Sequence, residues 1–195
     1  MNINRVRKTG FTLIELLAVV AIIGILSGVL IPAVGAVRKQ SKIAASKAQL
    51  ANYVNAMQLF KAEYKYFPLV SGTADSDEIK LSSESSDFIQ VISGRDPSTG
   101  ASVSFGGNRR RIGFYSFAAS EFWLDIDALS QTKLADRFNN RNIIIVVDTD
   151  GDGFVAPSVL AAETKEEDKR IRTNVTAFVG TDSADASNPT YELWQ

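Results

Sequence analysis

The stretch that decides the fold is Lys8-Thr9-Gly10-Phe11-Thr12-Leu13-Ile14-Glu15-Leu16-Leu17, and an apolar run continues from it to Val37. Glu15 is the only charged residue between Phe11 and Val37, and the next charge along the chain is Arg38. A carboxylate near the centre of a bilayer costs about 2.5 kcal/mol or more. We therefore expect Glu15 to have a partner that compensates its charge.

The apolar run is long enough to cross a membrane. It covers residues 11–37, and about 20 apolar residues suffice for a spanning helix. An ordinary secretory signal has a shorter apolar region and an exit of the A-x-A type, and this run has neither. Because both flanks of the run are basic, charge alone does not fix its orientation. The flanking basic residues are Arg5, Arg7 and Lys8 before the run, and Arg38, Lys39 and Lys42 after it.

These residues resemble the class III signal of type IV prepilins and of the related pseudopilins of type II secretion. The match consists of Gly10, Phe11, the run Thr12–Leu16 with Glu15 inside it, and Pro32. The resemblance implies that a prepilin peptidase cleaves between Gly10 and Phe11 and methylates the new N-terminus. It also implies a cytoplasmic leader (1–10), a transmembrane assembly helix (11–37) in the bacterial inner membrane and a periplasmic domain (38–195). The alternative is an uncleaved single-span anchor whose glutamate is incidental.

The same resemblance suggests a partner for Glu15. Family members pack their apolar helices into a filament, so Glu15 would neutralise the free amino group of Phe11 in a neighbouring copy. Gly24 and Gly28 have the four-residue spacing that lets helices approach closely in lipid. Pro32 lacks an amide hydrogen, so we expect a kink or a weak turn there. The implied partners are homologous and heterologous pilin subunits, the prepilin peptidase and a secretion or pilus assembly platform.

The rest of the chain is large enough for a domain but lacks common catalytic residues. Residues 38–195 can bury one hydrophobic core. The chain has no cysteine and no histidine, so it has no disulfide and lacks the commonest acid–base group at neutral pH. We find no nucleophile paired with a base and no phosphate-binding loop, and we predict that the chain is not an enzyme. The formal charge of −1 becomes −4 if the leader and its three basic residues leave, which argues against general nucleic-acid binding.

After the membrane segment, the helix is predicted to continue as an amphipathic helix over residues 38–64. Its apolar residues recur at helical spacing: Ile43, Leu50, Tyr53, Val54, Met57, Phe60 and Tyr64. The helix should end before Pro68, because the residue before a proline disfavours helical geometry. One helix of roughly 50 residues therefore begins the chain.

The remaining pattern predicts a small antiparallel sheet beside this helix. Strands are expected at Ile143–Val147 and Val175–Val179, with a return strand at Phe154-Val155 and a final edge at Tyr191–Trp194. The other expected segments are a polar loop at 69–87, a short helix Phe88–Ser93 capped by Ser85-Ser86-Asp87, a loop at 94–107, an extended segment Ile112–Phe117, an undecided segment Leu124–Leu129 and a turn or short helix Glu163–Arg170. The fold class is α+β and pilin-like.

The resemblance extends more loosely into this domain, toward the major, G-like pseudopilins. The similar segments are the stretch from Asn108 to Ile112-Gly113-Phe114-Tyr115, the strand Ile143–Val147 with the aspartates after it, and the turn Gly180-Thr181-Asp182. The Asp-Pro-Trp-Gly-like segment of that subfamily is not evident, because residues 137–142 occupy its place. This departure leaves the subfamily open.

An aspartate-rich turn follows the first clear strand. Asp148, Asp150 and Asp152 alternate along the turn before Gly153. Calcium takes six to eight oxygen ligands, and close carboxylates repel one another unless a cation lies between them. The turn is not a complete EF-hand, and we expect the further ligands to be Asp182 and Asp185 in a structural calcium site. The resemblance supports this, because major pseudopilins use calcium where many pilins use a disulfide. The alternative is a solvated hairpin turn.

A basic run, Arg109-Arg110-Arg111, stands near Phe105, Phe114 and Tyr115. Basic and aromatic residues together are typical of surfaces that bind single-stranded nucleic acid. The sequence favours the plainer explanation, a solvated turn beside core aromatics. The sequence thus leaves two functions open: a structural subunit of a type II secretion pseudopilus, and a minor pilin that binds DNA or surfaces.

Overall fold

The computed structural model describes residues 11–72, 76–125, 128–163 and 165–194. The chain divides into two compact units, one that extends to Ser41 and one that covers Lys42–Gln195. The second unit contains the sheet, the core and every cavity discussed below.

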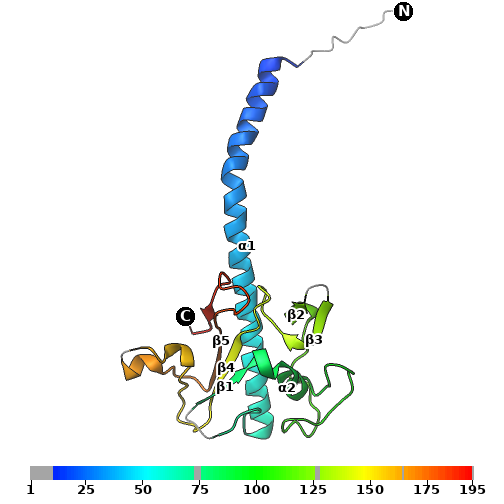
Figure 1. Ribbon diagram of the computed structural model, residues 1–195, viewed down its shortest axis with the longest axis vertical. Helices are drawn as coiled ribbons and strands as arrows, with labels where there is room; N and C mark the ends of the chain where they lie inside the picture. The colour runs from blue at the N-terminus through cyan, green and yellow to red at the C-terminus, as the bar shows by residue number, and fades with distance from the viewer. Residues whose placement is uncertain (1–10, 73–75, 126–127, 164, 195) are drawn as a thin grey trace, which may run out of the picture. The chain divides into compact units, whose positions relative to one another are not determined.

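Helix α1 (Leu13–Tyr64) is 52 residues long, which confirms the predicted long N-terminal helix (Figure 1). The backbone is helical at Pro32, so no turn interrupts α1 there, and the side chain of Pro32 lies outside the described residues. Within the second unit, α1 buries one side. Leu50, Tyr53, Met57 and Phe60 are each at most 1% exposed, at the spacing of a single helix face.

The main sheet has four antiparallel strands in the order β1-β4-β5-β6. These are β1 (Ser76–Lys80), β4 (Ile143–Asp148), β5 (Val175–Val179) and β6 (Tyr191–Glu192). β4 and β5 confirm the two clear predicted strands, and β6 confirms the predicted final edge. In the central pair, Ile143 lies opposite Val179 and Val147 lies opposite Val175.

Both faces of the central strands are covered. Ile143, Ile145 and Val147 belong to the large core cluster that also contains buried residues of α1 and of α2 (Leu81–Ser93). Ile144 and Val146 point to the other face, where a smaller cluster includes Phe178 and is partly covered by Trp194. Every residue of β4 is therefore buried, which explains its unbroken run of β-branched residues.

The segment 69–93 differs from the prediction. It contains β1 and a longer α2, which begins at Leu81 directly after the strand, whereas a loop and a helix starting at Phe88 were expected. Ser85 does not cap the helix but lies inside it, and its hydroxyl donates to the carbonyl of Leu81. Leu81, Phe88 and Ile92 are all buried along one face of α2, so packing stabilises a helix across the serine-rich stretch.

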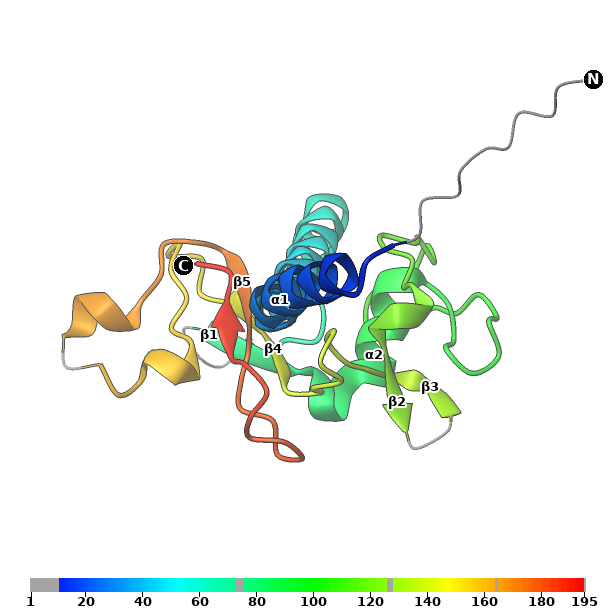
Figure 2. The same cartoon turned by 90° about the horizontal axis from the view of Figure 1, so that it is seen from above.

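A second sheet has two strands and is not hydrogen-bonded to the main sheet (Figure 2). It pairs β2 (Phe122–Asp125) with β3 (Ala128–Leu134), and this hairpin resolves the undecided segment 124–129. The 3-10 turn η1 (Ala119–Glu121) leads into it. Residues 112–117 contain no strand, but the amide of Phe114 donates to the carbonyl of Ile92 at 2.8 Å.

Residues 154–174 leave the main sheet and return to it. The expected return strand at Phe154-Val155 is only a single bridge, Val155 to Ile171. The excursion carries two 3-10 turns, η2 (Ser158–Leu160) and η3 (Glu166–Lys169), and the second confirms a short helix in the charged run.

Candidate functional site

The start of α1 holds the one acidic side chain of the apolar segment. The amide and the hydroxyl of Thr12 donate to Oε2 of Glu15 at 2.8 and 2.6 Å. The amide of Glu15 lies 3.3 Å from the hydroxyl oxygen of Thr12. A threonine before a helix and a glutamate three residues later form a capping box, which pairs amides that a helix start leaves open. In the single chain, the carboxylate of Glu15 thus binds to the start of its own helix.

The structure describes only one of the two residues at the expected cleavage site. Gly10 lies outside the described residues, while Phe11, on the other side of the expected cut, is 75% exposed. The helix that follows is long and apolar enough to cross a membrane by length and composition. Among its described side chains from Leu13 to Ser41, none is buried within the protein. A helix that is apolar on all sides needs an apolar surrounding, which fits a membrane-anchored protein.

The aspartate turn forms at the end of β4. One carboxylate oxygen from each of Asp148, Asp150 and Asp152 lies within 4.8 Å of the others, close enough to share a cation at calcium–oxygen distances. Asp148 is buried and accepts the amides of Gly151 at 2.7 Å and Gly153 at 3.1 Å. These bonds fold the turn so that the carboxylates converge.

Basic side chains also approach this turn. Arg170 forms an ion pair with Asp152, and the bond from the amide of Phe154, together with Arg170, lowers the pKa of that carboxyl. Lys61 and Lys65 line a cavity of about 250 Å³ that Asp148 and Asp150 also line. The protein can therefore offset part of the negative charge by itself.

Asp182 and Asp185 do not join the turn, which corrects the expected ligand set. Asp182 follows the end of β5, and β5 runs antiparallel to β4, so it lies at the end where β4 begins. Asp148 lies at the other end of β4, roughly 17 Å away at about 3.3 Å per strand residue. Asp182 instead accepts the amide of Ala184 at 2.9 Å, while Asp185 accepts the amide of Ser187 at 2.9 Å.

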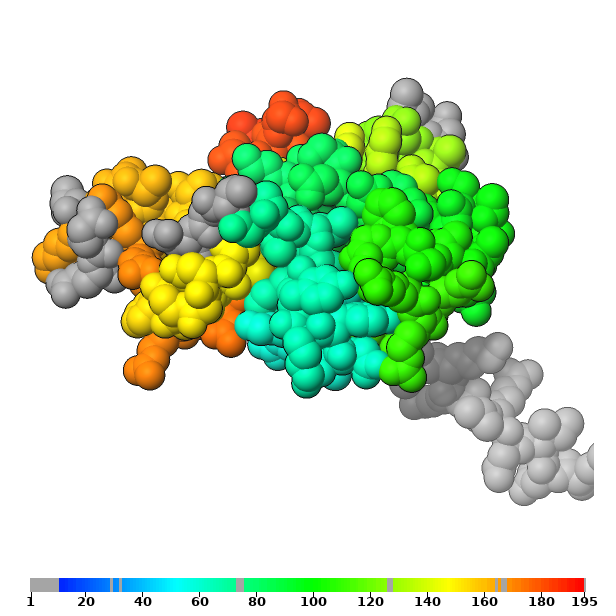
Figure 3. Space-filling model, turned by 90° about the horizontal axis from the view of Figure 1, so that it is seen from below, coloured from blue at the N-terminus to red at the C-terminus, as the bar shows by residue number. Residues whose placement is uncertain are grey.

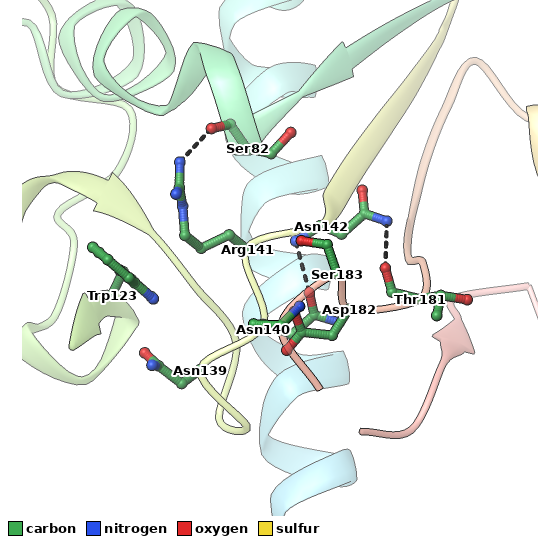
Figure 4. A pocket seen from close by; sticks show the side chains of 10 residues that line it. Ser82, Trp123, Asn139, Asn140, Arg141, Asn142, Thr181, Asp182 and Ser183 are labelled. Carbon is green, nitrogen blue, oxygen red and sulfur yellow. Dashed lines mark hydrogen bonds between the residues drawn. The ribbon is translucent and has the colours of Figure 1, made fainter. Parts of the chain in front are cut away.

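Asp182 lines a polar cavity of about 380 Å³ (Figure 4). The side-chain amide of Asn140 donates to Gly180, and that of Asn142 donates to Thr181, both at 2.9 Å. Arg141 donates to the carbonyl of Ser82. These polar groups join neighbouring loops to one another, and we assign them a structural role.

Near this cavity, Asp136 anchors the C-terminal strand. Its carboxylate accepts the amides of Phe138 and Asn140, both at 2.8 Å, and the hydroxyl of Tyr191. Burial raises the pKa of Asp136, with a further contribution from the charge of Asp182, although the three hydrogen-bonded groups act in the opposite direction. Tyr191 lies in β6, so this bond ties the last strand to the loop after β3.

The arginine run lies on an exposed loop that one buried asparagine holds in place. Asn108 is 0% exposed, whereas Arg109, Arg110 and Arg111 are exposed. The side chain of Asn108 donates to the carbonyls of Val91 and Ile112 at 2.8 and 2.7 Å. It accepts the hydroxyl of Tyr64 and the amide of Ile112, both at 2.9 Å. Its amide group is therefore fully used.

The sequence analysis missed two buried side chains that organise these loops, Asn108 and Glu121. Glu121 is 3% exposed and accepts the hydroxyls of Tyr53 at 2.9 Å and Tyr115 at 2.7 Å. Burial and the bond to Glu121 raise the pKa of Tyr115 to about 12. No local pattern marks either residue, because what buries them comes from distant segments: Tyr64 and Val91 for Asn108, and Tyr53 for Glu121.

Comparisons with curated proteins and with solved structures gave no match. The prokaryotic N-terminal methylation motif matches residues 5–31, which include Gly10, Phe11 and Glu15. This motif implies processing by a prepilin peptidase and assembly of pilin-type subunits. Together with a long N-terminal helix followed by a small antiparallel sheet, it marks the chain as a type IV pilin-like protein.

Proposed function

We propose that the chain is a structural subunit of a type IV pilus-related filament, and that this filament is a type II secretion pseudopilus. The observation that carries the proposal is the lone carboxylate of Glu15, inside the matched motif, at the start of an apolar segment whose described side chains from Leu13 to Ser41 are all unburied. Such a helix requires lipid or other helices around it. A filament core made of copies of the helix supplies that surrounding.

The proposed assembly begins with cleavage between Gly10 and Phe11, which frees the amino group of Phe11. This amine is one residue away from Thr12, whose amide Glu15 binds in the single chain. In the filament, Glu15 of one copy would pair with the amine of a neighbouring copy. Two charges that lipid would penalise are then satisfied together. The domain, residues 42–195, would lie in the periplasm and form the outer layer.

We favour a pseudopilus over a pilus because of features in the domain, residues 42–195. The chain has no cysteine, so no disulfide fixes its C-terminal region, and a carboxylate-rich turn follows the central strand. We propose that Asp148, Asp150 and Asp152 hold a structural calcium ion, with water or main-chain oxygens as the remaining ligands. The role of the protein is then mechanical and not enzymatic.

A second candidate function is that of a minor pilin that binds DNA or surfaces. The observation in its favour is the exposed run Arg109–Arg111. Arg110, however, pairs with Glu63, which reduces the positive charge offered to a phosphate backbone. Binding of DNA that weakens steeply with salt would favour this function over the pseudopilus.

The processing step gives the first test. Replacing Gly10 with valine should block cleavage, so the full-length band persists on a denaturing gel, whereas the unmodified chain loses residues 1–10. A matched control is Gly24→Ala, because nothing lies within 4 Å of a side chain added there. Mass spectrometry of the unmodified protein from membranes should give a methylated Phe11 as the first residue. A chain that still begins at Met1 would contradict the proposed function.

The calcium site is tested by thermal unfolding of the full chain in detergent, with calcium and with a chelator. At a calcium concentration of 100 times the Kd, binding adds about 2.7 kcal/mol, which corresponds to roughly 5–10 °C in Tm. Asp150→Asn should remove this shift while keeping the bond to the amide of Asp152. Asp185→Asn, which lies beyond the end of β5 that is far from the aspartate turn, should keep the Tm shift with calcium. If the Tm of the unmodified chain is the same with calcium and with the chelator, the calcium site is excluded.

A further inference from the structure

The β2–β3 hairpin carries an apolar pair that the domain does not cover. Leu124 and Leu129 lie directly opposite each other in the hairpin and are 54% and 47% exposed. Phe122, two residues before Leu124, shares its face and packs against the core. The apolar face of the hairpin therefore continues past the core into solvent. Asp125, the next residue of β2, is also exposed, and strand alternation turns its side chain to the opposite face at the same end of the hairpin. We call this end of the hairpin, formed by Leu124, Asp125 and Leu129, the hairpin patch.

A second exposed patch combines an aromatic ring with positive charge. Tyr66 is 47% exposed, and its hydroxyl lies 3.4 Å from the carbonyl of Gly107, immediately before the arginine loop. Arg109, Arg110 and Arg111 follow Gly107 closely along the chain and are exposed. We call Tyr66 and Arg109–Arg111 the arginine patch. Figure 3 views the domain from this end, where the end of α1 and the loop after α2 lie side by side.

The two patches lie at opposite ends of the domain along α1. The base of the hairpin is held by Gln49, which donates to Ala135 at 2.9 Å, whereas the arginine loop is held by Glu63, the partner of Arg110. Fourteen residues of helix separate Gln49 and Glu63, or about 20 Å. Figure 1 shows the same arrangement, with β2 and β3 displaced along α1 from the loop that follows α2.

We propose that the hairpin patch of one copy binds the arginine patch of the next copy. The contact rests on the proposed filament, and it names the surfaces through which the domains touch. The patches are complementary: leucines can pack on the ring of Tyr66, and Asp125 can pair with an arginine. Because the two patches differ and lie at opposite ends, their contact is heterologous, and such a contact builds an open helical polymer when the rotation between copies does not close a ring.

The absence of native cysteine makes a direct test possible. We would express the full chain with Leu129→Cys and Arg109→Cys together, oxidise the membranes mildly and separate the products without reducing agent. The expected result is a ladder of dimers, trimers and higher species that collapses on reduction. Each single variant should remain a monomer. The matched control pair is Val159→Cys with Arg109→Cys, since Val159 in η2 is 46% exposed, almost as Leu129 is, and should give no ladder.

The outcomes separate this contact from the filament itself. Filaments that sediment normally but give no ladder would overturn the contact and leave the proposed function standing. A dimer from Leu129→Cys alone would also overturn it, because that result requires two hairpins to meet. Absence of filaments from the unmodified chain, with an intact Met1, would overturn both. A charge test completes the set: Asp125→Arg should reduce filament yield several-fold, and adding Arg109→Glu should restore it.

Discussion

Glu15→Ala is expected to abolish filament assembly while cleavage between Gly10 and Phe11 continues. The carboxylate is the only charge in the apolar segment, and in the proposed filament it compensates the amine of Phe11 from a neighbouring copy. Without it, each new copy would leave an uncompensated ammonium group in an apolar core, at a cost of several kcal/mol. The measurement is the amount of sedimentable filament together with the gel position of the processed chain.

The capping box allows the role of charge to be separated from that of helix capping. Glu15→Gln keeps a side chain that can bind the amide of Thr12, as glutamine also serves in a capping box, but it removes the charge. We expect this variant to fail like alanine. Thr12→Val keeps the charge and removes the hydroxyl, and we expect it to assemble. Normal filaments from Glu15→Gln would refute charge pairing and leave capping as the function of Glu15.

Asn108→Ala is expected to lower the free energy of unfolding of the domain by about 3 kcal/mol. The substitution leaves the buried carbonyl of Val91 and the amide of Ile112 without their partners, and each unpaired buried group costs roughly 1–3 kcal/mol. For a domain of this size, the loss corresponds to a Tm decrease of about 6–12 °C. The measurement is the thermal unfolding of the full chain in detergent.

The control for this prediction is Asn55→Ala on α1. Asn55 is exposed, and alanine favours helix, so the Tm should change little or rise slightly. A Tm for Asn108→Ala within 1 °C of the unmodified chain would show that the bonds of Asn108 do not hold the loop. The same variant should also weaken the ladder of the cysteine pair, since Asn108 positions the arginine patch.

The elements that the sequence predicts well are those whose surroundings are uniform. No described side chain of the apolar segment is buried in the domain, so composition alone identifies it, and β4 is buried on both faces, so its β-branched run is unbroken. The serine-rich stretch before Phe88 is predicted as a loop because its local helix propensity is low. There the burial of Leu81 and Phe88 overrides propensity and begins α2 earlier.

Local sequence by itself determined the N-terminal methylation motif, the single carboxylate in the apolar helix, and the aspartate turn, because each is built from residues that are close along the chain. Tertiary structure alone decided which distant residues meet. The antiparallel direction of β5 places Asp182 at the other end of β4 from Asp148, and the packing of the loop after α2 buries Asn108. It also leaves Leu124 and Leu129 uncovered, since the hairpin extends beyond the core. Strand direction and burial arise from contacts between segments far apart in sequence, so no local pattern records them.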